Sequence, residues 1–301
     1  MRRKIVEKIL KDNGINTTNL KRDKIGKNYY VYLTDEFVVK IPKSKLSKKI
    51  YKKEFGFYQN FKLPFIPEFV ATGQEKKYKY LIIKRIQGKP LIDEFPNLTT
   101  EQVLGYFEQI CEYLNQIANL DYKEYAMANN FLLDNVTLAY QEYLSEVVDR
   151  FKKLKINTTK LEYIKDKVVE IIFRESKPIL LYNDFHFGNF IVNKTKLFFL
   201  DFDYNTCQPI DYFYHSIKVT FKFAKKCISK DKIEDGLEDK FLAIFLNRFK
   251  DEIDERYFEQ RQKFYDFCFD VNQVYLKKRL FKKHPYKKIL KTLEDYFFID
   301  K

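Results

Sequence analysis

The pattern of apolar and polar positions changes several times in the first part of the chain. Apolar residues between positions 5 and 10 recur at helical spacing and stop before Gly14, which predicts a short opening helix with a glycine cap. The runs 29–33 and 37–41 are instead rich in aromatic and β-branched residues, which favour strands. The polar residues 34–36 between them predict the turn of an antiparallel hairpin.

A second group of elements is predicted between this hairpin and residue 90. Helix-spaced apolar residues at 44–61 predict one helix, after which two prolines break the pattern. Residues 68–73 and 78–86 predict two further strands, joined by a polar turn at 74–77. The segment 87–90 contains Gly and Pro and is expected to interrupt all regular structure, so a small lobe of sheet and helix should end there.

The rest of the chain has a mainly helical pattern. Amphipathic helix is expected from residues 99–100 through Glu175, since the two threonines suit a helix start. Strand-like runs return only within 179–203, and residues from Asp211 onward again predict helices. The sequence therefore predicts an α+β fold with two domains, a small β-rich lobe at 1–90 and a larger, mainly helical lobe with a short β insert at 91–301.

Composition supports a globular chain. The 301 residues are 45% hydrophobic and 18% aromatic, which supplies ample material for a core. The net charge of +14 could attract nucleic acid or a membrane surface, but basic residues are scattered through nearly every segment. A compositional bias of the source explains the charge better, although the local excess at 277–284 could still attract an anion.

Cysteine usage and hydropathy favour a cytoplasmic protein without a membrane partner. The four cysteines, Cys111, Cys207, Cys227 and Cys268, are widely separated and form no C-x-x-C pair, so we expect free thiols in a reducing compartment. The N-terminus lacks an apolar leader, and no run approaches the roughly 18 apolar residues of a membrane span.

Polar residues with catalytic potential follow two short apolar runs. Asp184 comes after the first run and precedes Asn189, while Asp201 and Asp203 come after the second. Strands on both sides would hold such a loop rigidly, as the placement of a catalytic carboxylate requires. In phosphoryl transfer, one carboxylate orients or accepts the proton of the attacking hydroxyl, while amide and carboxylate oxygens hold magnesium against the phosphates. Asp184, Asn189 and Asp201 supply the oxygens that phosphoryl transfer needs.

Residues 183–189 followed by 200–203 resemble the paired motifs of the aminoglycoside phosphotransferase and choline kinase superfamily, which has a protein-kinase-like fold. Asp and Asn taken singly are common turn formers, so the inference depends on the whole set. The resemblance implies that Asp184 is the catalytic base and that Asn189 and Asp201 are magnesium ligands.

Several neighbouring residues receive supporting roles. By the resemblance, Asp211 is the family's bracing aspartate before a helix, and Asp203 supports the same segment. Tyr182 replaces the first histidine of the family motif, so no role of that imidazole is carried over. His186 either hydrogen-bonds the substrate or braces the loop, with bracing favoured, and His215 is expected to pack in a core or groove among aromatic residues.

The N-terminal lobe supplies the nucleotide-binding residues that the resemblance implies. Lys40, on the second strand of the hairpin, resembles the lysine that contacts the nucleotide phosphates, and Glu54 resembles the helix glutamate that orients it. Gly26 would belong to a shortened nucleotide loop. At the expected hinge, backbone groups of Lys84 and Ile86 would meet the purine, although an ordinary edge strand would have the same sequence.

These features predict a magnesium-dependent kinase that transfers the γ-phosphate of ATP or GTP to a hydroxyl of a small molecule. Carboxylates within 251–270 could hold an aminoglycoside-type acceptor, but the strongly basic stretch 277–291 follows them. Aromatic rings at 212–214 and 264–269 could hold a choline-like acceptor, though most of them are expected in the core. The acceptor, the choice of nucleotide and the oligomeric state stay open.

Three other functions compete with this prediction. A catalytically silent protein with the same fold is disfavoured because every expected polar residue is present. A protein kinase is disfavoured because residues 201–203 are followed closely by 209–211, without an activation segment between them. A basic nucleic-acid-binding protein is disfavoured because the chain has no recognisable module for that role.

Overall fold

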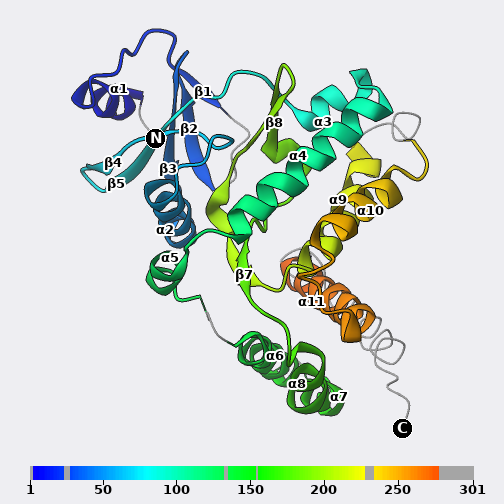
Figure 1. Cartoon of the computed structure of the whole chain (residues 1–301). Coiled ribbons are helices and arrows are strands. Elements are labelled where there is room, and N and C mark those ends of the chain that lie inside the picture. Colours follow the sequence, from blue (N-terminus) through cyan, green and yellow to red (C-terminus); the bar gives the residue numbers. More distant parts are fainter. Residues whose placement is uncertain (1–2, 24–27, 132–134, 154, 228–233, 278–301) are drawn as a thin grey trace.

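The protein has a sheet-rich N-terminal lobe and a larger, mainly helical C-terminal lobe (Figure 1). The computed structural model describes residues 3–23, 28–131, 135–153, 155–227 and 234–277. This architecture confirms the predicted α+β class, with short strands inserted among the C-terminal helices. The position of the domain boundary at residue 90 stays a prediction.

An antiparallel five-stranded sheet forms the N-terminal lobe, in the order β1-β2-β3-β5-β4. The predicted hairpin is confirmed as β2 and β3, in which Val31 lies opposite Lys40. Thr34 holds the turn, because its hydroxyl accepts hydrogen bonds from the amides of Glu36 (3.3 Å) and Phe37 (2.9 Å). The strands are β1 (Lys21–Asp23), β2 (Tyr29–Leu33), β3 (Phe37–Pro42), β4 (Phe69–Glu75) and β5 (Tyr78–Lys84).

Two predicted helices are confirmed beside this sheet. Helix α1 (Arg3–Asp12) ends before Gly14, whose φ of +71° is the left-handed conformation that glycine adopts readily. Helix α2 (Lys45–Asn60) begins after Ser44, whose side chain accepts a backbone hydrogen bond from the first turn.

The two helices cover opposite faces of the sheet. On strand β5, Ile82 packs in a cluster with α1, whereas Leu81 and Ile83 on either side of it belong to the main core, which includes α2. Successive side chains of a strand point to opposite faces, so the alternation explains both contacts. The sheet is thereby buried on both sides, and polar side chains on its inner strands are shielded from water.

The C-terminal lobe consists mainly of helices. The predicted helix start at Thr99 is confirmed by reciprocal side-chain hydrogen bonds between Thr99 and Gln102. The helices are α3 (Leu91–Glu94), α4 (Thr100–Ala118), α5 (Lys123–Ala128), α6 (Val136–Lys153), α7 (Thr159–Tyr163), α8 (Val169–Phe173), α9 (Tyr212–Cys227), α10 (Leu237–Phe249) and α11 (Phe258–Lys277). Short helical turns are η1 (Phe95–Asn97), η2 (Ile164–Val168), η3 (Phe187–Asn189), η4 (Phe202–Tyr204) and η6 (Glu255–Tyr257).

Five short strands lie between these helices, in two small antiparallel sheets. Strand β7 pairs with β10, and the second sheet has the order β6-β8-β9. The strands are β6 (Lys89–Pro90), β7 (Ile179–Leu181), β8 (Phe190–Asn193), β9 (Lys196–Phe199) and β10 (Thr206–Gln208). Two predictions need correction. Residues 87–90 are not wholly irregular, since Lys89 and Pro90 pair with β8, and β5 ends at Lys84 rather than at residue 86.

Aromatic side chains join the two lobes. Phe57 on α2 stacks on Phe202 with ring centroids 4.1 Å apart, and both rings are fully buried. The amide of Phe199 at the end of β9 donates to the carbonyl of Phe65 (2.8 Å), which follows α2. The main core therefore runs continuously from the N-terminal lobe into the segment that carries the predicted magnesium ligands.

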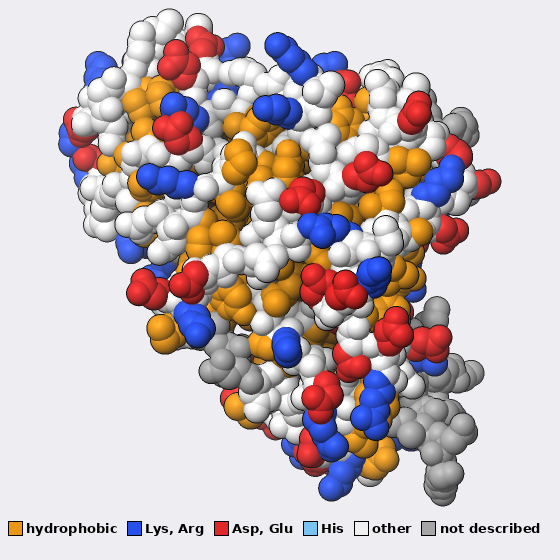
Figure 2. All heavy atoms as spheres, viewed as in Figure 1, with side chains coloured by type: hydrophobic (Ala, Val, Ile, Leu, Met, Phe, Trp, Pro, Cys, Tyr) orange, Lys and Arg blue, Asp and Glu red, His pale blue; other side chains and the backbone are white. Residues whose placement is uncertain are grey.

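The visible surface carries charges of both signs. Figure 2 shows Lys and Arg side chains interspersed with Asp and Glu side chains over this face, with no continuous basic area on it. In the parts of the chain that the structure describes, no helix is both long and apolar enough to cross a membrane. The basic stretch 277–291 lies outside the described residues, apart from its first position.

Candidate active site

Lys40 and Glu54 form a buried ion pair between strand β3 and helix α2. The Lys40 Nζ lies 2.5 Å from the Glu54 Oε1, and the two residues are only 6% and 0% exposed. The pair forms because β3 turns into α2 through a short connection, which brings a strand lysine beside a helix glutamate 14 positions later. Burial raises the pKa of Glu54, while the Lys40 charge opposes that rise.

Asp201 joins this pair from the C-terminal lobe. Its carboxylate accepts a hydrogen bond from the Lys40 Nζ, and its φ of +56° turns the backbone immediately after Leu200. Burial alone would lower the pKa of Lys40, but the carboxylates of Asp201 and Glu54 outweigh it, so the pKa lies well above its usual value. The lysine is therefore charged at neutral pH, and one ammonium group links the two lobes.

Asp184 and Asn189 are held together within the loop that follows β7. The Asn189 Nδ2 donates to both the Asp184 carbonyl (2.9 Å) and its Oδ2 (3.0 Å). Burial raises the pKa of Asp184, and the charge of His186 together with the Asn189 hydrogen bond counteracts part of that rise. The backbone carbonyl of Asn189 accepts a hydrogen bond from the amide of Leu200 (2.9 Å), the residue before Asp201. A backbone hydrogen bond therefore joins the two segments that carry the predicted magnesium ligands.

Tyr182 stands where the family motif has its first histidine. It is fully buried, and its hydroxyl donates to the Leu200 carbonyl (2.5 Å). This hydrogen bond ties the start of the Asp184 loop to the residue that precedes Asp201. The sequence assigned no role to Tyr182, because it replaces the histidine of the family motif and no role of that imidazole was carried over.

His186 and His215 have different surroundings. His186 is exposed, and its Nδ1 accepts the amide hydrogen of Gly188 (3.1 Å), which is a bracing contact within the loop. His215 on α9 is only 2% exposed, packs beside the Tyr265 ring and lies 3.0 Å from the Asp266 carboxylate. The predicted packing of His215 is thus confirmed.

Asp203 is buried close to the Lys40 cluster. Burial, followed by repulsion from Glu54, raises its pKa to about 8, and the residue is 4% exposed. Among the described residues, no hydrogen-bond partner is found for its Oδ1, for the Glu54 Oε2 or for the Tyr29 and Tyr58 hydroxyls. These buried polar atoms have unused hydrogen-bonding capacity beside the ion pair, which buried water would satisfy.

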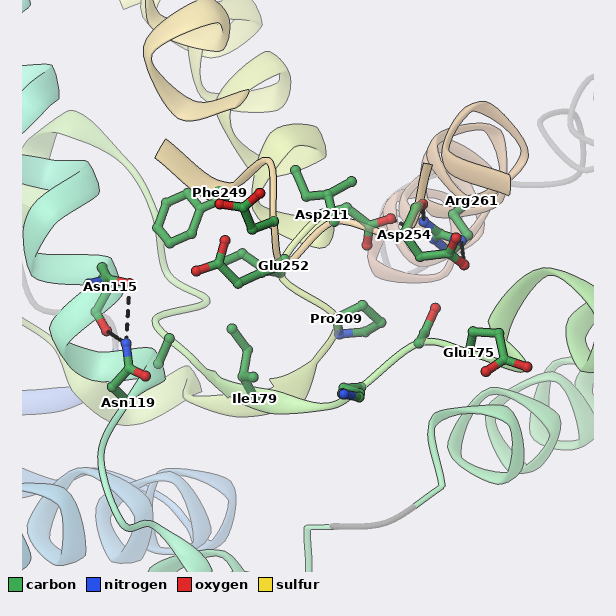
Figure 3. A pocket seen from close by; sticks show the side chains of 16 residues that line it. Asn115, Asn119, Glu175, Ile179, Pro209, Asp211, Phe249, Glu252, Asp254 and Arg261 are labelled. Carbon is green, nitrogen blue, oxygen red and sulfur yellow. Dashed lines mark hydrogen bonds and ion pairs between the residues drawn. The ribbon is translucent and has the colours of Figure 1, made fainter. Parts of the chain in front are cut away.

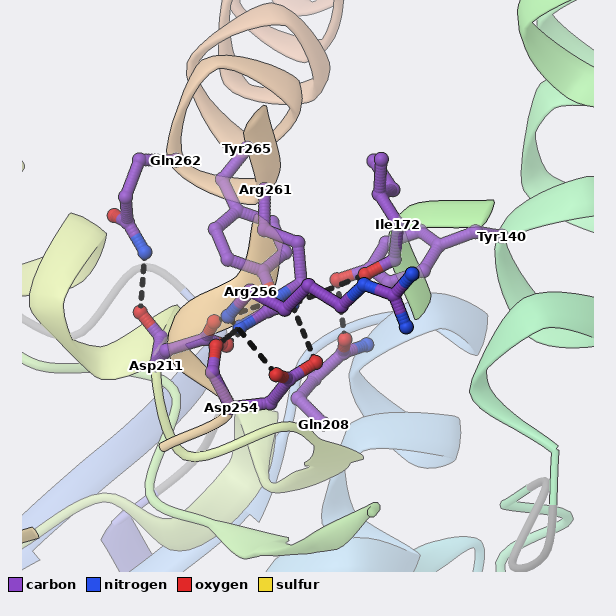
Figure 4. A network of polar contacts seen from close by, with 9 residues as sticks. All are labelled: Tyr140, Ile172, Gln208, Asp211, Asp254, Arg256, Arg261, Gln262 and Tyr265. Carbon is purple, nitrogen blue, oxygen red and sulfur yellow. Dashed lines mark hydrogen bonds and ion pairs between the residues drawn. The ribbon is translucent and has the colours of Figure 1, made fainter. Parts of the chain in front are cut away.

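Asp211 braces the helices behind the site, as Figure 4 shows. Its carboxylate accepts hydrogen bonds from the Arg261 Nε (2.5 Å) and the Tyr265 hydroxyl (2.9 Å), while its carbonyl accepts one from Gln262 (2.9 Å). Arg261 also bonds Asp254 (3.2 Å) and is 1% exposed. The start of α9 is thereby fixed to α11, and sequence reasoning missed Arg261 because a charged residue on a helix is usually exposed.

The hinge residues are placed at the end of β5. The Lys84 amide donates to the Glu68 carbonyl (2.8 Å), so a purine contact at Lys84 would use its carbonyl oxygen. Ile86 follows two positions later, beyond the strand, and is half-buried. Gly26 of the predicted nucleotide loop lies outside the described residues.

The available donors match the few ligands that magnesium takes from proteins. The Asn189 Nδ2 donates a hydrogen bond to Asp184, which leaves the side-chain oxygen of Asn189 free to bind a metal ion. Asp201 supplies a carboxylate as the second ligand. Within the described residues, no group of three or more His, Cys, Asp or Glu side chains could hold a metal ion by itself. Magnesium commonly completes its coordination with water and phosphate oxygens, so a two-residue site fits the ion only with a bound nucleotide.

The two-lobed fold, with an ion pair in the first lobe reaching a carboxylate in the second, defines a protein-kinase-like protein. Residues 17–212 match the family described as "Phosphotransferase enzyme family". This match covers more than half of the chain, and the chain therefore belongs to that family. It is a phosphotransferase.

Solved structures share the fold at low sequence identity. A streptomycin–ATP–APH(2")-IIa ternary complex is 19% identical and aligns over 98% of this chain and 96% of that chain, with a TM-score of 0.70. ADP-bound aminoglycoside phosphotransferase APH(2'')-Ib is 18% identical over 98% and 97%, with a TM-score of 0.63. A choline/ethanolamine kinase family protein from Mesorhizobium loti is 10% identical over 97% and 94%, with a TM-score of 0.57. No curated protein sequence matches significantly.

Proposed function

We propose that the protein is a magnesium-dependent kinase that transfers the γ-phosphoryl group of ATP or GTP to a hydroxyl of a small molecule. The observation that carries this proposal is the position of the Lys40 ammonium, which bonds Glu54 in one lobe and Asp201 in the other. A buried lysine next to a carboxylate of the other lobe is an arrangement that suits nucleotide phosphates and their metal.

Each proposed residue has a distinct task. Lys40 neutralises nucleotide phosphates and Glu54 fixes the lysine, while Asn189 and Asp201 supply oxygens to magnesium. The ion would offset the negative charge that develops on the phosphoryl oxygens. Asp184 accepts or orients the proton of the acceptor hydroxyl, and its hydrogen bond to Asn189 keeps the carboxylate in one orientation.

ATP is the favoured donor within this proposal, with GTP as the alternative. The similar APH(2")-type structures hold ATP or ADP, which supports an adenine nucleotide as donor. The predicted purine contacts at Lys84 and Ile86 use backbone groups, so their side chains do not distinguish the two bases. Equilibrium binding of both nucleotides to the same preparation would decide between them.

The acceptor is either aminoglycoside-type or choline-like. Asp266 and Asp270 on α11 are partly exposed carboxylates that could bind amino groups. Asp266 also contacts His215 on α9. Of the rings that could hold a quaternary ammonium group, Tyr212, Tyr214 and Phe269 are half-buried. Phe213, Phe264, Tyr265 and Phe267 are buried in the core, as expected from the sequence.

The catalytic assignment is tested with Asp184→Asn. We expect magnesium-dependent nucleotide binding to persist, whereas kcat on an acceptor identified by coupled nucleotide consumption falls about 10³-fold, because the proton acceptor is lost. Asp149→Asn, an exposed change on α6, serves as the matched control and should leave kcat unchanged. Intact turnover in Asp184→Asn would refute the assignment. Aminoglycosides, choline, sugars and amino alcohols form the acceptor screen.

The competing functions have clear experimental signatures. A silent binding protein would bind nucleotide without consuming it in the presence of any acceptor. A protein kinase would phosphorylate a protein substrate, although η4 is followed almost directly by β10 and α9. A salt-dependent shift of DNA or RNA without nucleotide binding would favour a nucleic-acid-binding protein.

A cytoplasmic location is part of the proposal. Cys111, Cys207 and Cys268 are free and buried. Burial raises the pKa of the Cys111 and Cys207 thiols to about 12, so they stay protonated and unreactive. Free structural thiols are typical of a reducing compartment. Fractionation of the source cells, followed by immunodetection, would test the location.

A further inference from the structure

A cavity lies in the C-terminal lobe, and none of the residues proposed for catalysis or metal binding lines it. Its volume is about 380 Å³, and neither Asp184 nor any residue of the Lys40 cluster lines it. Figure 3 shows that Phe249, Ile179 and Pro209 contribute to its wall. These side chains form an apolar surface that suits hydrocarbon rather than a strongly hydrated ion.

Carboxylates dominate the charged part of the wall. Glu175, Asp251 and Glu252 line the cavity, are exposed, and make no ion pair within the described residues. Figure 3 shows the Glu252 side chain in the middle of the view, between the asparagines of α4 and the Arg261 network. The cavity is therefore locally acidic in a chain whose net charge is +14.

The remaining charged groups do not reverse this balance. Arg261 lines the cavity but is shared between Asp211 (2.5 Å) and Asp254 (3.2 Å), so that trio remains net negative. Lys177 is the other cation of the wall. Five carboxylates thus face two cations, and an incoming ammonium group would be attracted.

Helix ends add to the attraction. Helix α4 ends at Ala118 and α10 at Phe249, and both residues line the cavity, while α8 ends at Phe173, two positions before Glu175. The carboxyl end of a helix carries a partial negative charge, which favours cations within the last turn. At the end of α4, the Asn119 Nδ2 donates to Asn115, which leaves the Asn119 amide oxygen as a further acceptor in the wall.

The cavity is separate from the proposed catalytic carboxylate. Ile179 in its wall begins β7, and Asp184 follows five positions later. Strand β7 ends at Leu181, and Asp184 lies in the loop beyond it and does not line the cavity. A phosphate acceptor must bring its hydroxyl within hydrogen-bonding reach of the catalytic base, so the acceptor site needs residues outside this wall.

We propose that this cavity binds a small aliphatic polyamine, a molecule with two or more ammonium groups joined by short hydrocarbon chains. The spread of the carboxylates matches separated ammonium groups, and the apolar wall matches the carbon chain between them. A single metal ion fits less well, because no three of the described carboxylates, histidines or cysteines lie close enough together to hold one.

Calorimetric titration of the full chain with spermidine tests the proposal. We expect one binding site whose dissociation constant rises at least tenfold in the triple variant Glu175→Gln/Asp251→Asn/Glu252→Gln, because three exposed charge interactions are removed. Glu255→Gln is the matched control, since Glu255 is exposed and near Glu252 but does not line the cavity. It should change the dissociation constant less than twofold. Thermal unfolding and nucleotide binding of the variants verify that each is folded.

Several results would overturn the proposal. Unchanged spermidine binding in the triple variant, or equal weakening in the control, would show that the cavity is not the site. Magnesium chloride alone giving the same saturable heat, lost in the same variant, would assign the cavity to a metal ion. The titration measures spermidine binding in the absence of nucleotide, so its outcome does not depend on the kinase assignment.

Discussion

At the scale of single residues, the site depends on one ammonium group with two carboxylate partners. Lys40 and Glu54 could be predicted from the sequence, because apolar neighbours place the lysine on a packed strand and the glutamate on the next helix. Their contact with Asp201, 161 positions after the lysine, depends on how the lobes pack and could be anticipated only through the family resemblance. The physical cause of the cluster is mutual neutralisation of charges that burial would otherwise destabilise.

Two variants at Lys40 and Glu54 distinguish the effect of the lysine on catalysis from its effect on stability. Lys40→Met leaves Glu54 buried without its cation, and we expect a loss of about 3 kcal/mol in the free energy of unfolding, together with a fall in kcat/KM of at least about 100-fold. In Lys40→Met/Glu54→Gln the unpaired charge is removed, so stability should largely return while activity stays low. Urea unfolding and initial rates provide the two measurements. Recovery of activity in the double variant would contradict the proposed role of the lysine.

At the scale of elements, strands and helix ends could be predicted where the pattern of apolar and polar positions extended over enough residues. The β2–β3 hairpin and α2 matched closely, but β1, β6 and β10 have only two or three residues, too few to show alternation. The roles of Tyr182 and Arg261 were missed for a different reason. Their hydrogen bonds reach Leu200 and Asp211 across the fold, and residue type alone did not reveal those partners.

The Tyr182 hydroxyl should contribute to the geometry of the catalytic loop. Tyr182→Phe removes the hydrogen bond from this buried hydroxyl to the Leu200 carbonyl, so we expect a loss of about 1 kcal/mol in stability and a several-fold lower kcat. The KM for nucleotide should change little, because Lys40 is untouched. Tyr122→Phe is the matched control, since that hydroxyl donates to the Pro178 carbonyl before β7. An equal fall in kcat in both variants would indicate a general loss of stability.

The Asp211–Arg261 network should hold α9 against α11. Arg261→Met leaves Asp211 buried without a cation, so we expect a loss of about 3 to 5 kcal/mol, and Arg261→Lys should recover only part of it because lysine lacks the planar fork. Arg256→Met changes an exposed arginine nearby and should alter stability by less than about 0.5 kcal/mol. Thermal and urea unfolding would measure all three. Similar values for Arg261→Met and Arg256→Met would disprove the bracing role.

At the scale of the whole molecule, the residues predicted to bind nucleotide and metal lie where the two lobes pack against each other. The order of a β-rich part followed by a helical part was visible in the sequence, and the structure has the same order of elements. The cavity of the C-terminal lobe could not be predicted, because its wall combines residues near positions 115, 175, 210 and 250. No local pattern connects such distant segments.

Ligand binding across the two lobes should stabilise the folded chain. We expect ATP with magnesium at 100 times its dissociation constant to add about 2.7 kcal/mol to the free energy of unfolding and to raise Tm by several degrees. EDTA should remove most of this increase, as should Asp201→Asn, which lacks the charged metal ligand. Differential scanning calorimetry measures the shifts. An ATP effect that is insensitive to EDTA would contradict the magnesium assignment.

The stacked pair of Phe57 and Phe202 has a consequence for how the proposed site is held before a ligand binds. Phe57 lies three positions after Glu54 and Phe202 directly follows Asp201, so the ring contact fastens the two acids that flank Lys40 to one another. Any outward swing of α2 would expose both rings to water, at a cost of a few kcal/mol. The ion pair that we propose for the nucleotide phosphates is therefore preorganised, because it is already in place before any ligand binds.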